Sequence, residues 1–271
     1  MSNFHKPKLQ IPKDKEAYIQ SALASIEAEH TVRFLFAIES GSRAWGFPSP
    51  DSDFDVRFVY AHQRDWYLDL FQGRDVIEVP LEGDWDINGW DVRKAIQLLL
   101  KPNPVLLEWL ASPIRYRWDE ASCEALLDFA ASHVSPQACA PHYFHLARKQ
   151  WQTYIDGAEK VNLKKYFYVL RPTLALRWVR LNPDRLPPMN LHDLLEGADV
   201  SGDLKSDLAR LLEIKAASSE VGVGDRLNSI DAIISEELHL AETTLPERPA
   251  PSDAAKVSGG KLFRDLIGTY K

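Results

Sequence analysis

The chain has 271 residues, of which 45% are hydrophobic and 26% charged, and its formal net charge at pH 7 is −7. This composition is typical of a globular protein, and no apolar run approaches the roughly 18 residues that a membrane-spanning helix needs. The acidic balance argues against a protein that coats nucleic acid through bulk electrostatic attraction. The polar N-terminal segment, residues 1–16, lacks the apolar core of a signal peptide, so we expect a cytoplasmic protein without a membrane partner.

The first part of the chain is predicted to contain both helices and strands. Residues 14–29 have apolar side chains at helical spacing and predict an amphipathic helix. Asp91 is expected to cap a helix over residues 92–101, and Pro104 is expected to open another over residues 105–112. Segments rich in β-branched and aromatic residues predict four strands, at residues 31–40, 54–62, 75–81 and 84–89.

From residue 120 onward the sequence predicts helices almost throughout. Residues 243–260 are rich in Pro and Gly and predict a linker before a short terminal helix. We therefore expect an α+β protein, in which a mixed β-sheet with flanking helices is followed by a helical C-terminal domain. The expected boundaries are 1–120 for the domain with the sheet, 121–245 for a helical substrate-binding or nucleotide-binding domain, and 246–271 for the linker and terminal helix.

Three acidic residues are predicted to converge at the strand over residues 54–62. Asp53 and Asp55 lie two residues apart, so their side chains point to the same face of that strand. Two carboxylates on one face repel each other, and a cation between them relieves the repulsion. Asp86 adds a third carboxylate if the strand over residues 84–89 pairs beside them. Such a set of oxygen ligands suits Mg²⁺ or Mn²⁺.

Asp84 and Asp91 compete with Asp86 for the third position. Asp84 shares a strand face with Asp86 but lies nearer to the loop. Asp91 opens a run with helical periodicity, which favours a role as the helix N-cap. Asp86 is therefore the favoured third acid, with the other two left as alternatives.

A Gly-Ser pair, Gly41-Ser42, follows the first predicted strand. Glycine permits a tight turn, and the turn leaves backbone N–H groups and the Ser42 hydroxyl available to phosphate oxygens. The loop that follows leads to Asp53 and Asp55. Each feature is common in ordinary turns, whereas the order strand, Gly-Ser, loop, Asp-x-Asp, strand is rare.

This order resembles the signature of the DNA polymerase β-type nucleotidyltransferase superfamily. The resemblance narrows to the predicted nucleotidyltransferases of the YcgL/RlaP type, which are associated with RNA repair, on three segments: GSRAWGFPSPDSDFDVRFVY, DWDINGWDVRKAIQLLLKPNPVLLEWLASPIRY and KKYFYVLRPTLALRW. It implies a nucleotidyltransferase-type sheet domain, a divalent metal and an NTP substrate. It also implies that Gly41 and Ser42 hold phosphate and that Asp53, Asp55 and Asp86 are catalytic metal ligands.

Three residues near this motif are weaker candidates. Arg43 follows the phosphate turn and is a possible contact of the triphosphate, with a solvated arginine as the alternative. Arg57 alternates with Asp55 along the strand and is expected to support the acids. Trp45 either stacks on a base or covers the core beneath the loop.

Residues 141–190 form a basic segment, with nine Lys or Arg against three acids and a local balance of +6. Lys164 and Arg171 share a helical face, so together with Lys165 they are candidates for binding a triphosphate across a cleft. The alternative is a solvated basic helix face.

The favoured function is transfer of NMP from an NTP to a hydroxyl, with an RNA end as the expected acceptor. Transfer to a protein or a small molecule is the alternative among enzymes. The alternative that is not an enzyme is a catalytically silent nucleotide-binding or antitoxin-like module. The intact set of acids argues against a silent module, because clustered like charges are costly to keep.

Overall fold

In a computed structural model of the chain, the structure describes residues 11–81, 83–217, 222–245, 247 and 250–268. Most of the polar N-terminal segment therefore lies outside the described residues. The chain divides into two compact units. The first, called the sheet unit, comprises residues 11–44, 53–134 and 250–268. The second, called the helical unit, comprises residues 45–52 and 135–247. The gaps given above apply to both ranges. No helix among the described residues is long and apolar enough to cross a membrane.

The sheet unit is built on a five-stranded mixed sheet with the strand order β3-β4-β2-β1-β5. Its strands are β1 (Val32–Glu39), β2 (Phe54–His62), β3 (Val76–Glu78), β4 (Trp85–Asp91) and β5 (Arg115–Trp118). β2 and β4 pair in parallel, and the other neighbours pair antiparallel. The four predicted strands are present. β5 was not predicted, because the arginines in its short sequence RYRW interrupt the apolar signal.

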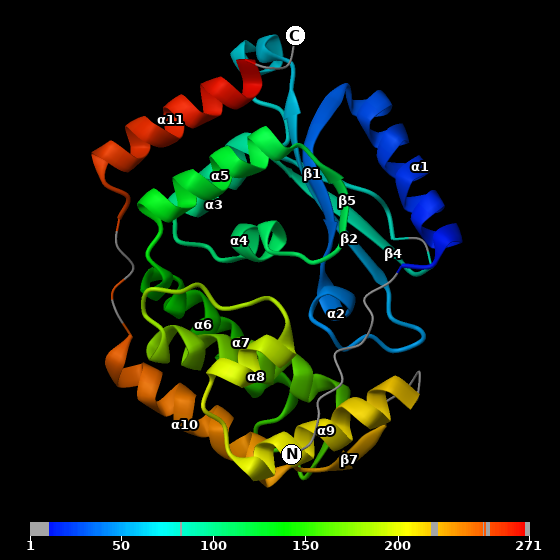
Figure 1. Cartoon of the computed structure of the whole chain (residues 1–271), viewed down its shortest axis with the longest axis vertical. Coiled ribbons are helices and arrows are strands. Elements are labelled where there is room, and N and C mark those ends of the chain that lie inside the picture. The colour runs from blue at the N-terminus through cyan, green and yellow to red at the C-terminus, as the bar shows by residue number, and fades with distance from the viewer. Residues whose placement is uncertain (1–10, 82, 218–221, 246, 248–249, 269–271) are drawn as a thin grey trace. The chain divides into compact units, whose positions relative to one another are not determined.

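Helices cover both faces of this sheet (Figure 1). On one face, α1 (Lys13–His30) buries Ile19, Leu23 and Ile26 in a cluster with the apolar side chains of the strands. On the other face lie α3 (Val92–Leu100), α5 (Glu120–His133) and α11 (Asp253–Gly268). Three short helices stand between strands in chain order, namely α2 (Gly41–Ala44), η1 (Arg64–Leu68) and α4 (Val105–Leu110). The α+β fold class is thus confirmed.

Helix α11 starts earlier than the sequence predicted. It begins at Asp253, inside the segment expected to be a linker, and the Ser252 hydroxyl caps it by accepting a hydrogen bond from Ala255 N at 3.1 Å. At Gly259 a β-carbon would meet Leu100 at 3.3 Å, so this glycine lets α11 lie close to α3. Gly259, one of the two glycines that suggested a linker, therefore serves helix packing.

The compact units also differ from the predicted boundaries. α5 packs against β1 and α3, so the sheet unit continues to residue 134 instead of ending at residue 120. α11 contacts α3 and α5, so it belongs to the sheet unit and is not a separate terminal element. Chain order alone does not reveal such packing, because the contacts join segments far apart in the sequence.

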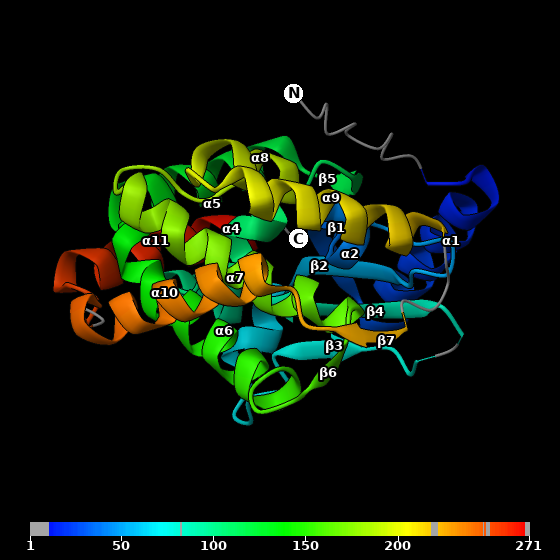
Figure 2. The same cartoon turned by 90° about the horizontal axis from the view of Figure 1, so that it is seen from below.

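The helical unit is centred on α7 (Lys164–Leu181), which contacts α6 (Ala140–Tyr154), α8 (Leu191–Gly197) and α10 (Asn228–Thr244) (Figure 2). Its remaining elements are η2 (Pro136–Cys139), α9 (Gly202–Ala217) and the paired strands β6 (Lys160–Asn162) and β7 (Val223–Asp225). The loop at residues 45–52 is part of this unit. Leu191 N donates to Trp45 O at 2.9 Å, and the ring of Phe47 stacks on that of Phe167.

Candidate active site

The register of two neighbouring strands brings Asp55 and Asp86 side by side. β2 and β4 pair in parallel with Asp55 opposite Asp86, as predicted for the strand over residues 84–89. Asp53 lies one residue before β2 and is exposed. Burial raises the pKa of Asp55 above its usual range; Arg57 opposes this rise, and repulsion by Asp86 and Asp53 adds to it. The three acids therefore share one electrostatic environment.

Arg57 bridges the two paired acids. Its Nη2 lies 3.2 Å from Asp55 Oδ1 and 2.6 Å from Asp86 Oδ2, and its Nη1 donates to Asp86 O at 2.7 Å. The guanidinium balances the charge of both carboxylates and fixes their orientation. Its predicted support of the acids is thus present in the structure.

The structure separates the roles of the competing acids. Asp91 caps α3, accepting a hydrogen bond from Arg93 N at 2.7 Å, as predicted. It also accepts from Tyr67 Oη at 2.7 Å, and burial raises its pKa to about 6. Asp84 is exposed and contributes its backbone oxygen, which accepts from Phe54 N at 2.7 Å. Asp86 is the acid paired with Asp55 across the strands.

Gly41 begins α2 directly against the Asp55 side chain. It adopts a left-handed φ of 57°, and a β-carbon at this position would lie 1.8 Å from Asp55 Oδ2. Ser40 N donates to Asp55 O at 2.8 Å, which holds the turn against β2. Glycine is therefore required at residue 41 both for its backbone conformation and for the approach of the carboxylate.

Arg43 lies within the acid cluster. Its Nε donates to Asp53 O at 3.2 Å and lies 4.0 Å from Glu39 Oε1, and its guanidinium lies over the ring of Phe54. These contacts tie the end of α2 to the start of β2. Contact of Arg43 with a triphosphate remains a prediction.

Glu39 is a buried acid behind Asp55 that the sequence did not single out. It is fully buried, its Oε1 accepts from Asp55 N at 3.1 Å, and its Oε2 accepts from Tyr116 Oη at 2.7 Å. Burial raises the pKa of Glu39 to about 7. The signal was present in the sequence, since Glu39 is the acid that ends a strand whose other residues, apart from Arg33, are apolar.

Tyr116→Phe is expected to lower the free energy of unfolding by about 1–3 kcal/mol, because it leaves Glu39 Oε2 buried without its hydroxyl donor. Urea denaturation measures the change. Tyr154→Phe is the matched control, since Tyr154 is 38% exposed, and it should shift stability by less than about 0.5 kcal/mol. Equal effects in the two variants would contradict the inferred role of the Tyr116 hydrogen bond.

The predicted basic contacts belong to the helical unit. Arg171 is 4% exposed, donates from Nε to Met189 O at 3.2 Å and lies over the ring of Trp45. Lys165 lies over the rings of Tyr154 and Tyr168. Lys164 is half-buried at the start of α7. That these three residues face the acids of the sheet unit remains a prediction.

Trp45 packs within the helical unit. Its ring is half-buried, with Phe47 and Tyr168 against it and the Arg171 guanidinium 4.7 Å from its centroid. These contacts favour the packing alternative over a base-stacking role.

Comparisons with known proteins identify the family. Residues 16–265 match the model of RlaP, described as the RNA repair pathway DNA polymerase beta family. The chain belongs to this family. It is 42% identical over 249 residues to the uncharacterized protein YcgL of Bacillus subtilis (strain 168), covering 92% of this chain and 94% of that protein. The resemblance on the three motif segments is thereby confirmed.

The family match spans both compact units and every predicted site residue. A solved structure of a nucleotidyltransferase-like protein from Exiguobacterium sibiricum 255-15 also matches, at 12% identity and a TM-score of 0.28. The match covers 93% of this chain and 81% of that protein's chain. That likeness is too distant to support an argument about the site.

The chemistry of the acids in this RlaP family member fits a divalent cation. Asp55 and Asp86 present carboxylates in register, and Asp53 is close enough to repel Asp55. Among the described residues, however, no three acid, His or Cys side chains stand together as a ready metal cage. Arg57 neutralises two of the acids in this arrangement, so an entering cation would share or replace the charge that Arg57 now supplies.

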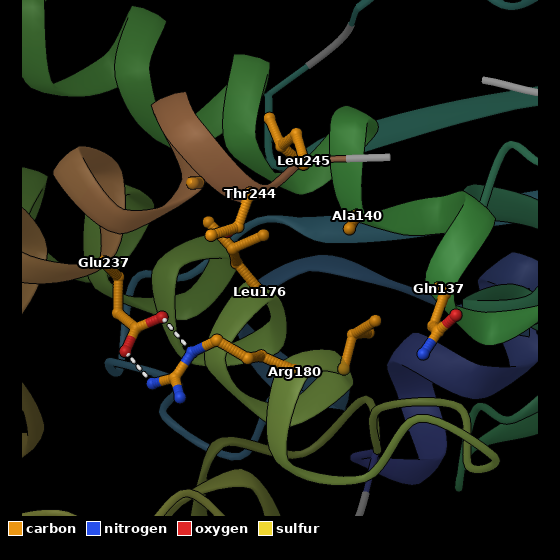
Figure 3. A pocket seen from close by; sticks show the side chains of 9 residues that line it. Gln137, Ala140, Leu176, Arg180, Glu237, Thr244 and Leu245 are labelled. Carbon is orange, nitrogen blue, oxygen red and sulfur yellow. Dashed lines mark hydrogen bonds and ion pairs between the residues drawn. The ribbon is translucent and has the colours of Figure 1, made fainter. Parts of the chain in front are cut away.

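Part of the predicted basic excess is balanced inside the helical unit. Glu237 of α10 is 1% exposed and pairs with both Arg177 and Arg180, and Glu242 lies 3.6 Å from Arg148. The Arg180–Glu237 pair lies at a cavity of about 360 Å³ whose other lining residues are Gln137, Ala140, Leu176, Val179, Ala241, Thr244 and Leu245 (Figure 3). The local balance of +6 therefore overstates the charge that is available to a ligand.

Proposed function

We propose that this protein is a divalent-metal-dependent nucleotidyltransferase that moves NMP from an NTP to a hydroxyl acceptor, with an RNA end as the acceptor. The observation that carries the proposal is the pairing of Asp55 with Asp86 directly beside the Gly41 turn. Membership of the RNA repair pathway DNA polymerase beta family supports the reaction class and the choice of RNA.

The three acids are assigned two roles, cation binding and proton acceptance. Asp53, Asp55 and Asp86 would hold the cation, which when bound neutralises charge on the phosphates. The Asp86 side chain is 39% exposed against 25% for Asp55, so Asp86 is the better placed to accept the proton of the acceptor hydroxyl. The hydroxyl oxygen then bonds to the α-phosphorus, the bond to the bridging oxygen breaks, and pyrophosphate leaves with that electron pair.

Gly41 and Ser42 would position the outgoing phosphates. The Gly41 turn lies against Asp55, so phosphate oxygens held by the Ser42 hydroxyl and nearby N–H groups would lie close to the acids. Positioning and charge neutralisation are the main contributions that a site of this kind makes to phosphoryl transfer.

The direct test supplies each α-labelled NTP in turn, with Mg²⁺ or Mn²⁺, to the protein together with total cellular RNA and protein. Label in RNA with release of pyrophosphate is the expected result. If protein or a small-molecule fraction gains the label instead, the acceptor is a protein or a small molecule and not RNA. If no NTP supports transfer although the protein binds nucleotide, the protein is a nucleotide-binding module and not an enzyme.

Ser42→Ala is expected to weaken NTP binding by roughly 1.5–3 kcal/mol, the contribution of a hydrogen bond to a charged group. Titration calorimetry with a non-hydrolysable NTP and Mn²⁺ measures it. Ser25→Ala is the control, because Ser25 is exposed and bonds within its own helix. Wild-type affinity in Ser42→Ala would mean that the hydroxyl does not hold phosphate.

A further inference from the structure

Lys215, on α9, is a buried lysine in the helical unit. It is 2% exposed, and its Nζ lies 4.4 Å from the centroid of the Phe47 ring and 5.2 Å from that of Phe167. Among the described residues, neither a hydrogen bond nor an ion pair reaches this ammonium group. Burying an ammonium without such a partner is costly, so hydrophobic packing alone does not account for a lysine here.

The charges around Lys215 increase this cost. The pKa of Lys215 is lowered to about 8, mainly by burial and in addition by repulsion from Lys164, while Asp51 partly opposes both. Asp51 is exposed, so it compensates the two lysines only weakly. Arg177 and Arg180 differ from them, because the buried Glu237 pairs with both.

The position of Lys215 adds to this positive potential. Phe167 belongs to the first turn of α7, a helix of 18 residues, so Lys215 lies beside the positive end of its dipole. Phe47 belongs to the loop at residues 45–52, which leads into Asp53. The two rings keep water from one side of the ammonium, and a charge contact there is stronger than one in open solvent.

We propose that Lys215 and Lys164 form a phosphate-binding subsite of the helical unit. A phosphate group supplies the negative charge that the two lysines lack, and lysine is a common phosphate partner. The phosphate would come from the nucleotide or from an RNA strand, an assignment that rests on the proposed function. The competing explanation is that Lys215 only covers the two aromatic rings, and it predicts no loss of anion affinity when the charge is removed.

The test compares Lys215→Met with the wild-type chain by calorimetry in EDTA, so that the acids cannot contribute through metal. The probes are ATP, inorganic tripolyphosphate and a 5′-hydroxyl oligoribonucleotide. Lys215→Met should weaken binding of at least one probe roughly ten- to 100-fold, the range of a lost hydrogen bond to a charged group. It should keep or raise the melting temperature, because methionine fills similar space without the buried charge.

Lys205→Met is the matched control, since Lys205 lies on the same helix and loses the same charge. It should leave all three affinities within about twofold of wild type. Lys164→Met is the second variant and should weaken the same probe as Lys215→Met. It keeps the proposal testable if Lys215→Met does not fold.

The pH dependence is a further readout. The charged groups that act on Lys215 are Lys164 and Asp51. Wild-type affinity for ATP in EDTA should fall between about pH 7.5 and about pH 9.5, because Lys215 loses its proton over this range. Lys215→Met should flatten this fall.

Each outcome decides a different point. Loss of ATP and tripolyphosphate binding assigns the subsite to the nucleotide, and loss of oligoribonucleotide binding alone assigns it to RNA. Unchanged affinity for all three probes in both lysine variants would overturn the subsite, even if labelled NTP is still transferred. Lysine-dependent binding without any transfer would leave the subsite standing and remove the proposed enzymatic function.

Discussion

Asp55→Asn is expected to lower the rate of nucleotide transfer by about 10³-fold or more, which corresponds to roughly 4 kcal/mol of lost transition-state stabilisation. Asp55 is the acid most closely surrounded by the other groups of the site, since Arg57, Gly41 and the register partner Asp86 all lie against it. An amide is a much weaker ligand for a hard cation than a carboxylate. Mn²⁺ affinity should therefore fall together with the rate.

The fold should tolerate this substitution. The backbone of Asp55, not its carboxylate, bonds to Glu39 Oε1 and to Ser40 N, and asparagine keeps both contacts. Burial and repulsion by Asp86 and Asp53 together outweigh the attraction between Arg57 and the Asp55 charge, so removing that charge should leave the free energy of unfolding level or raise it. Asp75→Asn is the control, because Asp75 is an acid of the same unit paired with Lys94 at the surface. Wild-type Mn²⁺ affinity and transfer rate in Asp55→Asn would exclude Asp55 as a metal ligand.

The acid pair was predictable because it depends on local patterns. Alternation along β2 places Asp55 and Arg57 on one face, and the turn residues before β2 mark where the strand begins. The choice of Asp86 over Asp84 and Asp91 needed the register of β2 against β4. The capping role of Asp91 could be predicted, since it depends on the adjacent helix.

The residues that the sequence analysis missed depend on contacts between distant segments. Tyr116 reaches Glu39 across 77 positions, through a strand with a weak sequence signal. Lys215 is an ordinary lysine in a helical sequence, and its burial follows from the placement of Phe47 and Phe167 around it. The charge of Arg177 and Arg180 is balanced from α10, about 60 residues later. Local charge counting cannot include such partners.

Gly41→Ala is expected to disrupt the acid site as severely as removal of a carboxylate, while the chain remains folded. The new β-carbon would lie 1.8 Å from Asp55 Oδ2, a separation that no pair of non-bonded atoms can hold. The Asp55 carboxylate or the turn must therefore move, and either movement separates the proposed phosphate-binding residues from the acids. We expect Mn²⁺ affinity and nucleotide transfer to fall together, the rate by about 10²-fold or more, because misplacement by about 1 Å has effects of this size.

Gly157→Ala isolates the part of this effect that comes from backbone strain. Gly157 has a φ of 69°, close to the 57° of Gly41, and a β-carbon there would meet nothing within 4 Å. Both substitutions force alanine into the left-handed region, at about 1 kcal/mol of stability each. The loss of metal affinity and transfer in Gly41→Ala beyond that in Gly157→Ala therefore measures the contact with Asp55. If both variants keep wild-type Mn²⁺ affinity and transfer, the Gly41 turn does not position the acids, and its glycine serves the backbone alone.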